Sequence, residues 1–433
     1  MNKERTVEHQ EYAMRVASAM AIAGALVTGW TSGVSETPLA VPLSSLAEEA
    51  RAIGILEIGR LLIVSILLLK GRVRTALFAS GASAILYWLA RYSIMGAFIP
   101  MVAVLCLFLG CIWNRDSKTK QVLATVFLGA TFLVAALQKI NSGYLSGLEF
   151  TSREGFLSFA RHHLNVVISA QLGIFLAMTS VVSELILAAG LLMGIRFFSH
   201  LAVALILFLT ILNPPVSFVY LYVGSLAVLA DPKFAANLQN SKFGEHFTLV
   251  SAWALLQLYL FPSYLFENSG ASQLGALFRP LVFVLFCGWA HLHFAKQSMV
   301  EGFFIRNWKD AVVKNRGPIA LLLFYFLGSY LFFQAGGPSP LGLSMFSSQV
   351  RKSSSYQLEF TSREDCLLVS RSLKLTVVAD VSVKYSEDSC VLSVPTESGL
   401  EYVERKICRY GIRGTMITKN RLKGMNRNWN CND

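Results

Sequence analysis

Ala-Ala-Leu-Gln-Lys-Ile-Asn-Ser-Gly-Tyr-Leu-Ser-Gly, residues 135–147, closes an apolar run that begins at residue 122. Such a run is typical of a membrane-crossing helix, and here it ends on a lysine, Lys139, before a glycine-bearing turn with one aromatic residue, Tyr144. Two interpretations of this lysine stay open. Its stem can follow the helix end so that the ammonium reaches the lipid headgroups. Alternatively, loss of hydration favours the neutral amine, which can act as a base.

The composition of the chain predicts an integral membrane protein. Of its 433 residues, 54% are hydrophobic and only 15% are charged, whereas a soluble domain averages roughly 25% charged residues. The formal net charge is +12, but the basic residues stand in short segments between apolar runs. They therefore indicate orientation in a lipid bilayer, and nucleic acid is not an expected partner.

The apolar runs predict an all-α polytopic membrane bundle of about 9–11 transmembrane helices. The runs are residues 14–30, 52–69, 75–90, 94–113, 122–137, 172–195, 201–212, 216–230, 247–266, 276–295 and 318–333. With the N-terminus in the cytoplasm, alternation places every strong basic cluster inside, as the positive-inside rule requires. These clusters are 70–74, 115–120, 233–242 and 296–316. We expect the bacterial inner membrane, with Lys139 and the C-terminal tail on the extracytoplasmic side.

Three units follow from the pattern. Residues 1–51 form an N-terminal signal-anchor helix and polar loop, although cleavage as a signal peptide stays open. Residues 52–335 form the transmembrane bundle. Residues 351–433 form a small β-rich extracytoplasmic domain, because residues 373–383 partly alternate between apolar and polar and residues 389–394 follow after a turn.

The tail carries four cysteines, which predict two disulfides in an oxidising compartment, with all three pairings open. They are Cys366, Cys390, Cys408 and Cys431. The tail also repeats, at residues 358–364, the sequence Leu-Glu-Phe-Thr-Ser-Arg-Glu of residues 148–154. Each copy contains Thr-x-x-Glu, a capping box that can start a helix, and the role of the repeat stays open.

Several polar residues in or near the apolar runs need an interpretation. Glu57 and Arg60 share a helical face and can neutralise each other, so the pair is either structural or functional. His291 and His293, two residues apart, do not share a face and are interpreted as interfacial. No histidine spacing predicts a metal site.

Residues 136–147 resemble a signature of the vitamin K-dependent gamma-carboxylase family and its bacterial relatives, which share the horizontally transferred transmembrane (HTTM) domain. The matching features are Lys139, the apolar Ile140, a small polar stretch, the aromatic Tyr144 and Gly147. The similarity continues, over roughly residues 52–234, in features that follow in the family's order. These are Arg60, Glu184, Arg196, His200 and the Asp231-Pro232 pair.

The resemblance implies a lyase in which Lys139 deprotonates a reduced quinone such as vitamin K hydroquinone. His200 would orient an oxyanion or a polar head group, although an interfacial structural histidine is the other interpretation. Glu184, Tyr144 and Arg60 would contact the substrate, with Glu184 next to His200 in the bundle. Gln138 stands where the carboxylases have a second lysine, so carboxylation of protein glutamate is not expected.

The sequence leaves open whether the chain is an enzyme. Residues 183–196 also look like the DoxX/MauE-type bundle proteins, which often act as non-catalytic accessory subunits. The sequence does not indicate which protein partner such a subunit would bind. A transporter built from repeats would show two similar halves with broken helices, and the sequence has no such symmetry.

Overall fold

The computed structural model describes the chain in separate ranges. They are residues 2–33, 50–91, 98–140, 145, 170–212, 217–240, 284, 285, 287–289, 291, 293, 295, 304–334, 356–360, 390–394, 416–420 and 425–429. Tyr144, the first copy of the repeat and the predicted strand 373–383 lie outside them. Cys366, Cys408 and Cys431 do too, so the disulfide pairings stay predictions.

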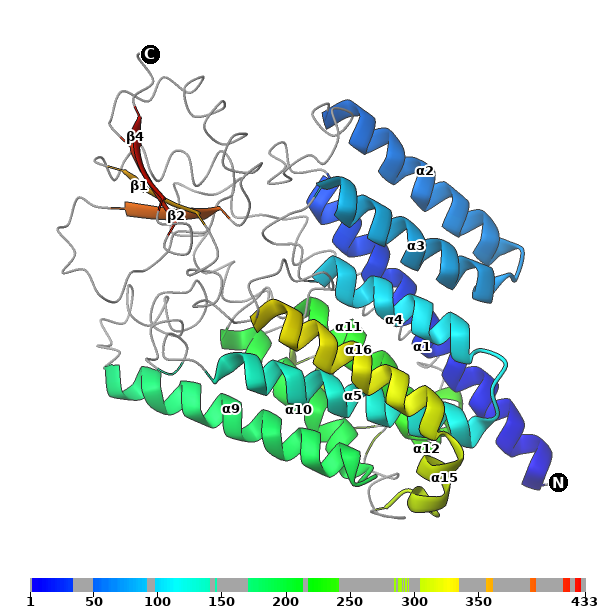
Figure 1. Ribbon diagram of the computed structural model, residues 1–433. Coiled ribbons are helices and arrows are strands. Elements are labelled where there is room, and N and C mark those ends of the chain that lie inside the picture. The colour runs from blue at the N-terminus through cyan, green and yellow to red at the C-terminus, as the bar shows by residue number, and fades with distance from the viewer. Residues whose placement is uncertain are drawn as a thin grey trace.

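The described chain is mainly helical (Figure 1). Its helices are α1 (Asn2–Gly33), α2 (Ala50–Leu69), α3 (Val73–Arg91), α4 (Phe98–Ile112), α5 (Ser117–Lys139), α9 (Ala170–Leu192), α10 (Phe197–Leu212), α11 (Ser217–Ala230), α12 (Pro232–Gln239), α15 (Trp308–Lys314) and α16 (Arg316–Gln334). Most coincide with the predicted apolar runs, because a long apolar segment satisfies its backbone polar groups internally only as a helix.

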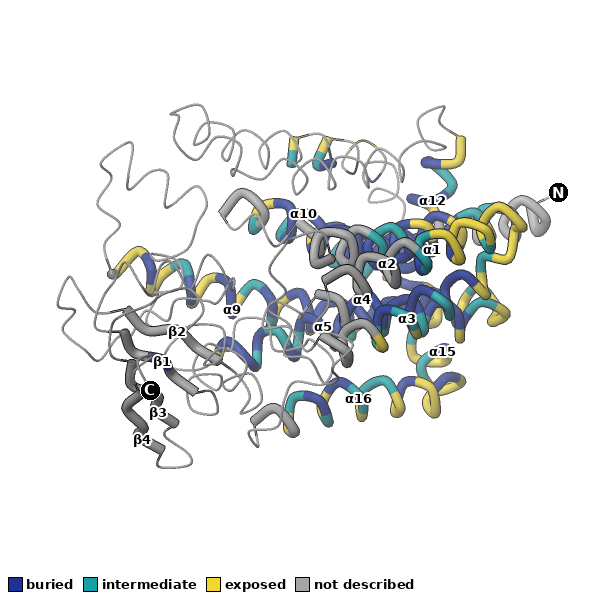
Figure 2. Tube along the Cα trace, turned by 90° about the horizontal axis from the view of Figure 1, so that it is seen from above, coloured by how far each residue is buried: buried dark blue, intermediate teal, exposed yellow. Residues whose placement is uncertain are grey.

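Helix α5 is the centre of this bundle, with α9, α11 and α16 packed against it. Figure 2 shows α5 as mainly buried and α9 as alternately buried and exposed. The ring of Phe127 on α5 contacts Phe108 of α4 and Phe326 of α16, with centroids 4.4 and 5.0 Å apart. At Gly129, a Cβ would lie 3.1 Å from Leu192, so the glycine lets α9 approach α5 closely.

Two of the described helices, Ser117–Lys139 and Gln171–Leu192, are long and apolar enough to cross a membrane. A third span would be the pair Trp308–Lys314 and Arg316–Leu331, which is bent by 82°. Helix α9 exposes an apolar row that suits lipid better than water. The row is Phe175, Met178, Val182 and Ile186. The larger predicted count, the orientation and the compartment stay predictions.

Four short strands form one antiparallel sheet in the order β2-β1-β3-β4. They are β1 (Tyr356–Phe360), β2 (Cys390–Val394), β3 (Met416–Asn420) and β4 (Met425–Trp429). Strand β2 falls in the predicted strand 389–394, and Leu358 in β1 pairs with Leu392 and Thr418. The four strands together account for 20 residues, and a β-rich domain over 351–433 stays a prediction.

Candidate functional site

Lys139 and Glu184 form a buried ion pair between α5 and α9. Lys139 Nζ contacts Glu184 Oε1 and lies 3.4 Å from the hydroxyl oxygen of Ser180, one helical turn before Glu184. The exposed fractions of the Lys139 and Glu184 side chains are 1% and 4%. The lysine therefore does not reach toward headgroups along the helix surface; it points into the helix–helix contact.

Burial of the Lys139–Glu184 pair has a large cost in desolvation free energy. Removing two ions from water costs several kcal/mol for each, and their attraction offsets this cost only while both partners are present. Only one carboxylate oxygen of Glu184 is used in this way. Its second oxygen, Oε2, is buried and has no hydrogen-bond partner among the residues that the structure describes. One side of the carboxylate is thus available for a proton or a ligand.

The other two predicted substrate-binding residues are Arg60 and Tyr144. Arg60 is buried in α2 and donates a hydrogen bond of 3.0 Å to the carbonyl oxygen of Ala25 in α1. The side chain of its predicted partner Glu57 lies outside the described residues. The whole of Tyr144 lies outside them too.

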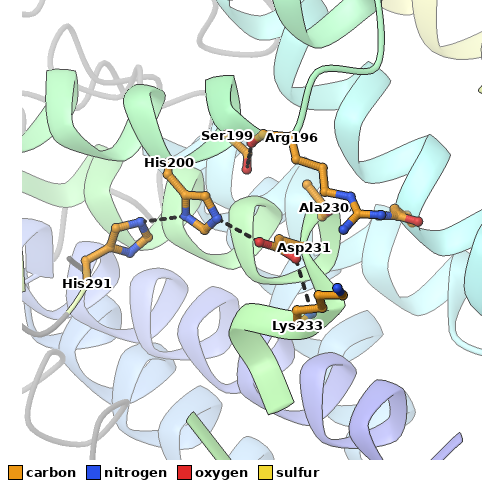
Figure 3. A network of polar contacts seen from close by, with 8 residues as sticks. Arg196, Ser199, His200, Ala230, Asp231, Lys233 and His291 are labelled. Atoms are coloured by element: carbon orange, nitrogen blue, oxygen red, sulfur yellow. Dashed lines mark hydrogen bonds and ion pairs between the residues drawn. The ribbon is translucent and has the colours of Figure 1, made fainter. Parts of the chain in front are cut away.

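His200 belongs to a second buried cluster (Figure 3). Its Nε2 lies 2.9 Å from Asp231 Oδ2, and its Nδ1 lies 3.0 Å from Nε2 of His291. The three side chains come from three places: the first turn of α10, the junction of α11 and α12, and the helical residues between 284 and 295. The ring of Phe234 covers both imidazoles, with centroids 5.4 and 4.8 Å away.

The interpretation of His291 as interfacial is wrong. His291 is 3% exposed, and Cys287 and Ala295, four residues before and after it, are buried as well. This spacing puts the three on one helical face, which packs into the bundle. His293 is exposed instead and stacks on Trp289, with centroids 5.5 Å apart. The prediction that the two histidines occupy different faces is correct, but one face is internal.

The two clusters lie near opposite ends of α5. Gln121, in the first turns of α5, donates a hydrogen bond of 2.8 Å to the carbonyl oxygen of Ala230, next to Asp231. From Gln121 to Lys139 the helix rises about 27 Å at 1.5 Å per residue. The prediction that Glu184 is the neighbour of His200 is therefore wrong: Glu184 contacts Lys139, and His200 lies in a separate site.

Sequence reasoning missed Asp231 and His291 as site residues. Asp231 carries a local signal, because an aspartate before a proline at the end of an apolar run is a typical helix N-cap. Its Oδ1 does accept from the backbone N–H of Lys233, at 3.1 Å. Its contact with His200 is tertiary and leaves no sequence signal. Within the described ranges, no group of three His, Cys, Asp or Glu side chains is arranged to hold a metal ion.

Comparison of the chain with known proteins adds no assignment to this geometry. No protein-family model, no curated protein and no solved structure matches the chain.

Proposed function

We propose that the chain is an integral membrane enzyme that removes a proton from a lipid-soluble acidic substrate, a reduced quinone being the best candidate. Lys139 is the base, and Glu184 is its proton partner. The observation that supports this proposal is the buried contact of Lys139 Nζ with Glu184 Oε1, between two helices able to cross a membrane. The similarity to the carboxylase and HTTM proteins gives it a chemical precedent, and kinship with them is part of the proposal.

The buried pair offers a route to a neutral amine. Transfer of one proton from Lys139 Nζ to Glu184 Oε1 converts two buried charges into two neutral groups, which removes the cost of holding ions away from water. The amine then takes the hydroxyl proton of the quinol: the O–H bond breaks, an N–H bond forms, and the quinol anion lies beside the new ammonium. Ser180 can accept a hydrogen bond from that ammonium.

The remaining site residues are assigned by role. We place the substrate at the extracytoplasmic end of α5, where Ile140 is 52% exposed just after the buried lysine. Tyr144 would contact the quinol ring, and Arg60 its polar groups. His200 has no part in this step, because its cluster lies at the other end of α5.

The test uses the full chain in nanodiscs with reduced menadione as the probe. Oxygen consumes a quinol anion faster than the neutral quinol, so the rate of menadiol oxidation reports the anion. We expect Lys139→Arg, which keeps the positive charge but does not release its proton, to lower the protein-dependent rate about 100-fold, the low end for a general base. Glu184→Gln should lower it as well. A Lys139→Arg protein as active as the unchanged chain would disprove the role of Lys139.

A non-catalytic accessory protein, similar to the DoxX/MauE type, is the second candidate. The observation that favours it is the contact between Lys139 and Glu184, because this contact links α5 to α9 without any ligand. In that case menadiol oxidation shows no protein-dependent rate. Exchanging the charges, with Lys139→Glu and Glu184→Lys together, would then preserve the free energy of unfolding of the protein.

A further inference from the structure

We propose that the junction of α15 and α16 is a docking surface for an anionic phospholipid. The phosphate lies against the cations of α15, and one acyl chain follows the outer face of α16. The junction is at the end of α5 opposite Lys139, because α15 packs against α5 and its Lys314 lies near Asp116, the N-cap of α5. The surface is therefore independent of the quinol reaction.

The direction of α15 places it along the membrane surface. Helix α16 runs beside α5, one of the helices able to cross a membrane (Figure 1), and the two contact through Phe127 and Phe326. Since α15 is bent by 82° from α16, it runs close to the plane of the membrane. Lys309, Asp310 and Lys314 on α15 are exposed. Charged side chains in this position suit the boundary between water and lipid, not the hydrocarbon core.

The exposed side chains of α15 and its flanks carry an excess of positive charge. Four cations stand there against one acid, Asp310. The cations are Arg306, Lys309, Lys314 and Arg316. Within the described ranges, Arg306, Lys309 and Arg316 form no ion pair. Anionic headgroups attract basic segments at the membrane surface, and an arginine can bind a phosphate through two hydrogen bonds. The charge therefore fits a phospholipid headgroup.

The outer face of α16 offers a path for an acyl chain below these cations. Phe324, Leu327 and Leu331 are all exposed. At 3.6 residues per turn, the three lie within about 80° of Arg316 around the helix axis. The apolar stripe therefore starts under a cation and continues along the helix, which matches a phospholipid with its phosphate at Arg316.

The combination of charge and apolar surface is what selects an anionic lipid. Helix α9 also exposes an apolar row, but its 23 residues include no Lys or Arg. Its row fits the acyl chain of a lipid of any charge. At the α15–α16 junction the same kind of apolar surface adjoins unpaired cations, so a neutral lipid would leave those cations without a partner.

The docking surface is held in place by contacts with the turn between α9 and α10. The indole Nε1–H of Trp308 donates to the carbonyl oxygen of Leu192 at 3.1 Å, and the backbone N–H of Ile305 donates to that of Gly194 at 2.9 Å. Ala311 is buried on the inner side of α15. Because these contacts use none of the exposed cations, replacing one cation should leave α15 folded.

The test uses the full chain in nanodiscs of phosphatidylcholine. A minor fraction of the lipid carries a photoactivatable acyl chain and is either phosphatidylglycerol, which is anionic, or phosphatidylcholine. Mass spectrometry of the labelled peptides then gives the ratio of phosphatidylglycerol to phosphatidylcholine labelling on α16 and on α9. We expect this ratio to be at least about fivefold higher on α16, which corresponds to the attraction of one Lys or Arg for an anionic surface.

The matched variants are Arg316→Gln and Lys233→Gln. Both remove one exposed cation at the same end of the bundle, since α12 begins beside Ala230, which contacts the start of α5. Phe234 and Leu238, which follow Lys233 on α12, are buried, so no apolar stripe continues from that cation. We expect Arg316→Gln to lower the α16 ratio about fivefold and Lys233→Gln to leave it unchanged.

Three results would overturn the proposal. The first is an equal labelling ratio on α16 and α9 in the unchanged chain. The second is an equal effect of the two variants, which would mean that the cations act only through the net charge of this end of the bundle. The third is protection of α16 from both lipids together with photo-cross-links between copies of the chain, which would make this face a protein interface.

Discussion

The Lys139–Glu184 pair and the Asp231–His200–His291 chain are both buried and both polar, yet they are built differently. The pair joins two long apolar helices through one contact between an amine and a carboxyl group. The Asp231–His200–His291 cluster joins three separate segments through two contacts of 2.9 and 3.0 Å. An ion pair of two residues therefore depends on both of its members. In a hydrogen-bonded cluster of three residues, loss of one end still leaves the other two in contact.

Loss of one partner of the ion pair should have the largest effect. Lys139→Met keeps much of the side-chain volume but leaves Glu184 buried with an uncompensated charge, which costs about 3–5 kcal/mol of the free energy of unfolding. The measurement is reversible unfolding in mixed detergent micelles. The control is the double variant Lys139→Met with Glu184→Leu, which should recover most of the loss. A double variant as unstable as the single one would mean that the charge is not the cause.

The turn between α9 and α10 sets the position of one cluster relative to the other, and it depends on Gly194. This residue has φ +77°, and a Cβ there would lie 2.4 Å from the indole of Trp308. The indole Nε1–H donates to the carbonyl oxygen of Leu192, at 3.1 Å. Gly194→Ala should therefore destabilise the fold by about 2–4 kcal/mol through backbone strain and overpacking.

The matched control is Gly317→Ala, since a Cβ at that helical glycine meets nothing within 4 Å. It should be neutral or slightly stabilising in the same unfolding assay, because alanine favours the helix. Equal effects of the two substitutions would show that Trp308 does not constrain the α9–α10 turn.

Loss of the Asp231 carboxylate should lower the free energy of unfolding less than loss of one member of the Lys139–Glu184 pair. Asp231→Ala loses the cap of α12 and the acceptor for His200, which together should cost about 1–3 kcal/mol in the unfolding assay. Asp231→Asn keeps the cap and should cost less. If Asp231→Ala destabilises the protein as much as Lys139→Met, the Asp231–His200–His291 cluster depends on charge in the same way as the Lys139–Glu184 pair.

The smallest effect concerns Asp116, the N-cap of α5. This helix carries Lys139 and, through Gln121, contacts the residue before Asp231. Partial burial alone would raise the pKa of Asp116, but hydrogen bonds from the N–H and hydroxyl of Thr119, with Lys314 nearby, outweigh it and lower the pKa. The stabilisation is therefore complete above the ordinary aspartate pKa of about 4 and disappears as the pH falls through the lowered value.

Asp116→Ala should cost about 1 kcal/mol at neutral pH, as for other N-caps, and this difference from the unchanged chain should shrink below pH 4. Unfolding measured between pH 3 and 7 checks it, with Asp116→Asn as the control that keeps a cap but does not titrate. A difference that is constant with pH would show that the charge of Asp116 does not support α5.

The sequence by itself determined the apolar helices and the position of their unusual charges. Residues 122–137 and 172–195 predict α5 and α9, because the length and apolarity of a segment are local properties that decide whether it is helical and buried. Lys139 and Glu184 stand out for the same reason: a charge in an apolar run has no local partner and must find one in the bundle. Strand β2 followed from a short apolar segment after a turn.

Only the tertiary structure decided which polar residues meet. Arg60 donates to the carbonyl oxygen of Ala25 in α1, and His200 binds Asp231 and His291 rather than joining Lys139. These contacts depend on which helix faces pack together and at what height. Spacing along one segment reports the face on which a residue lies, but it does not report which of the other helices covers that face. His291 was therefore assigned to the correct kind of segment and to the wrong environment.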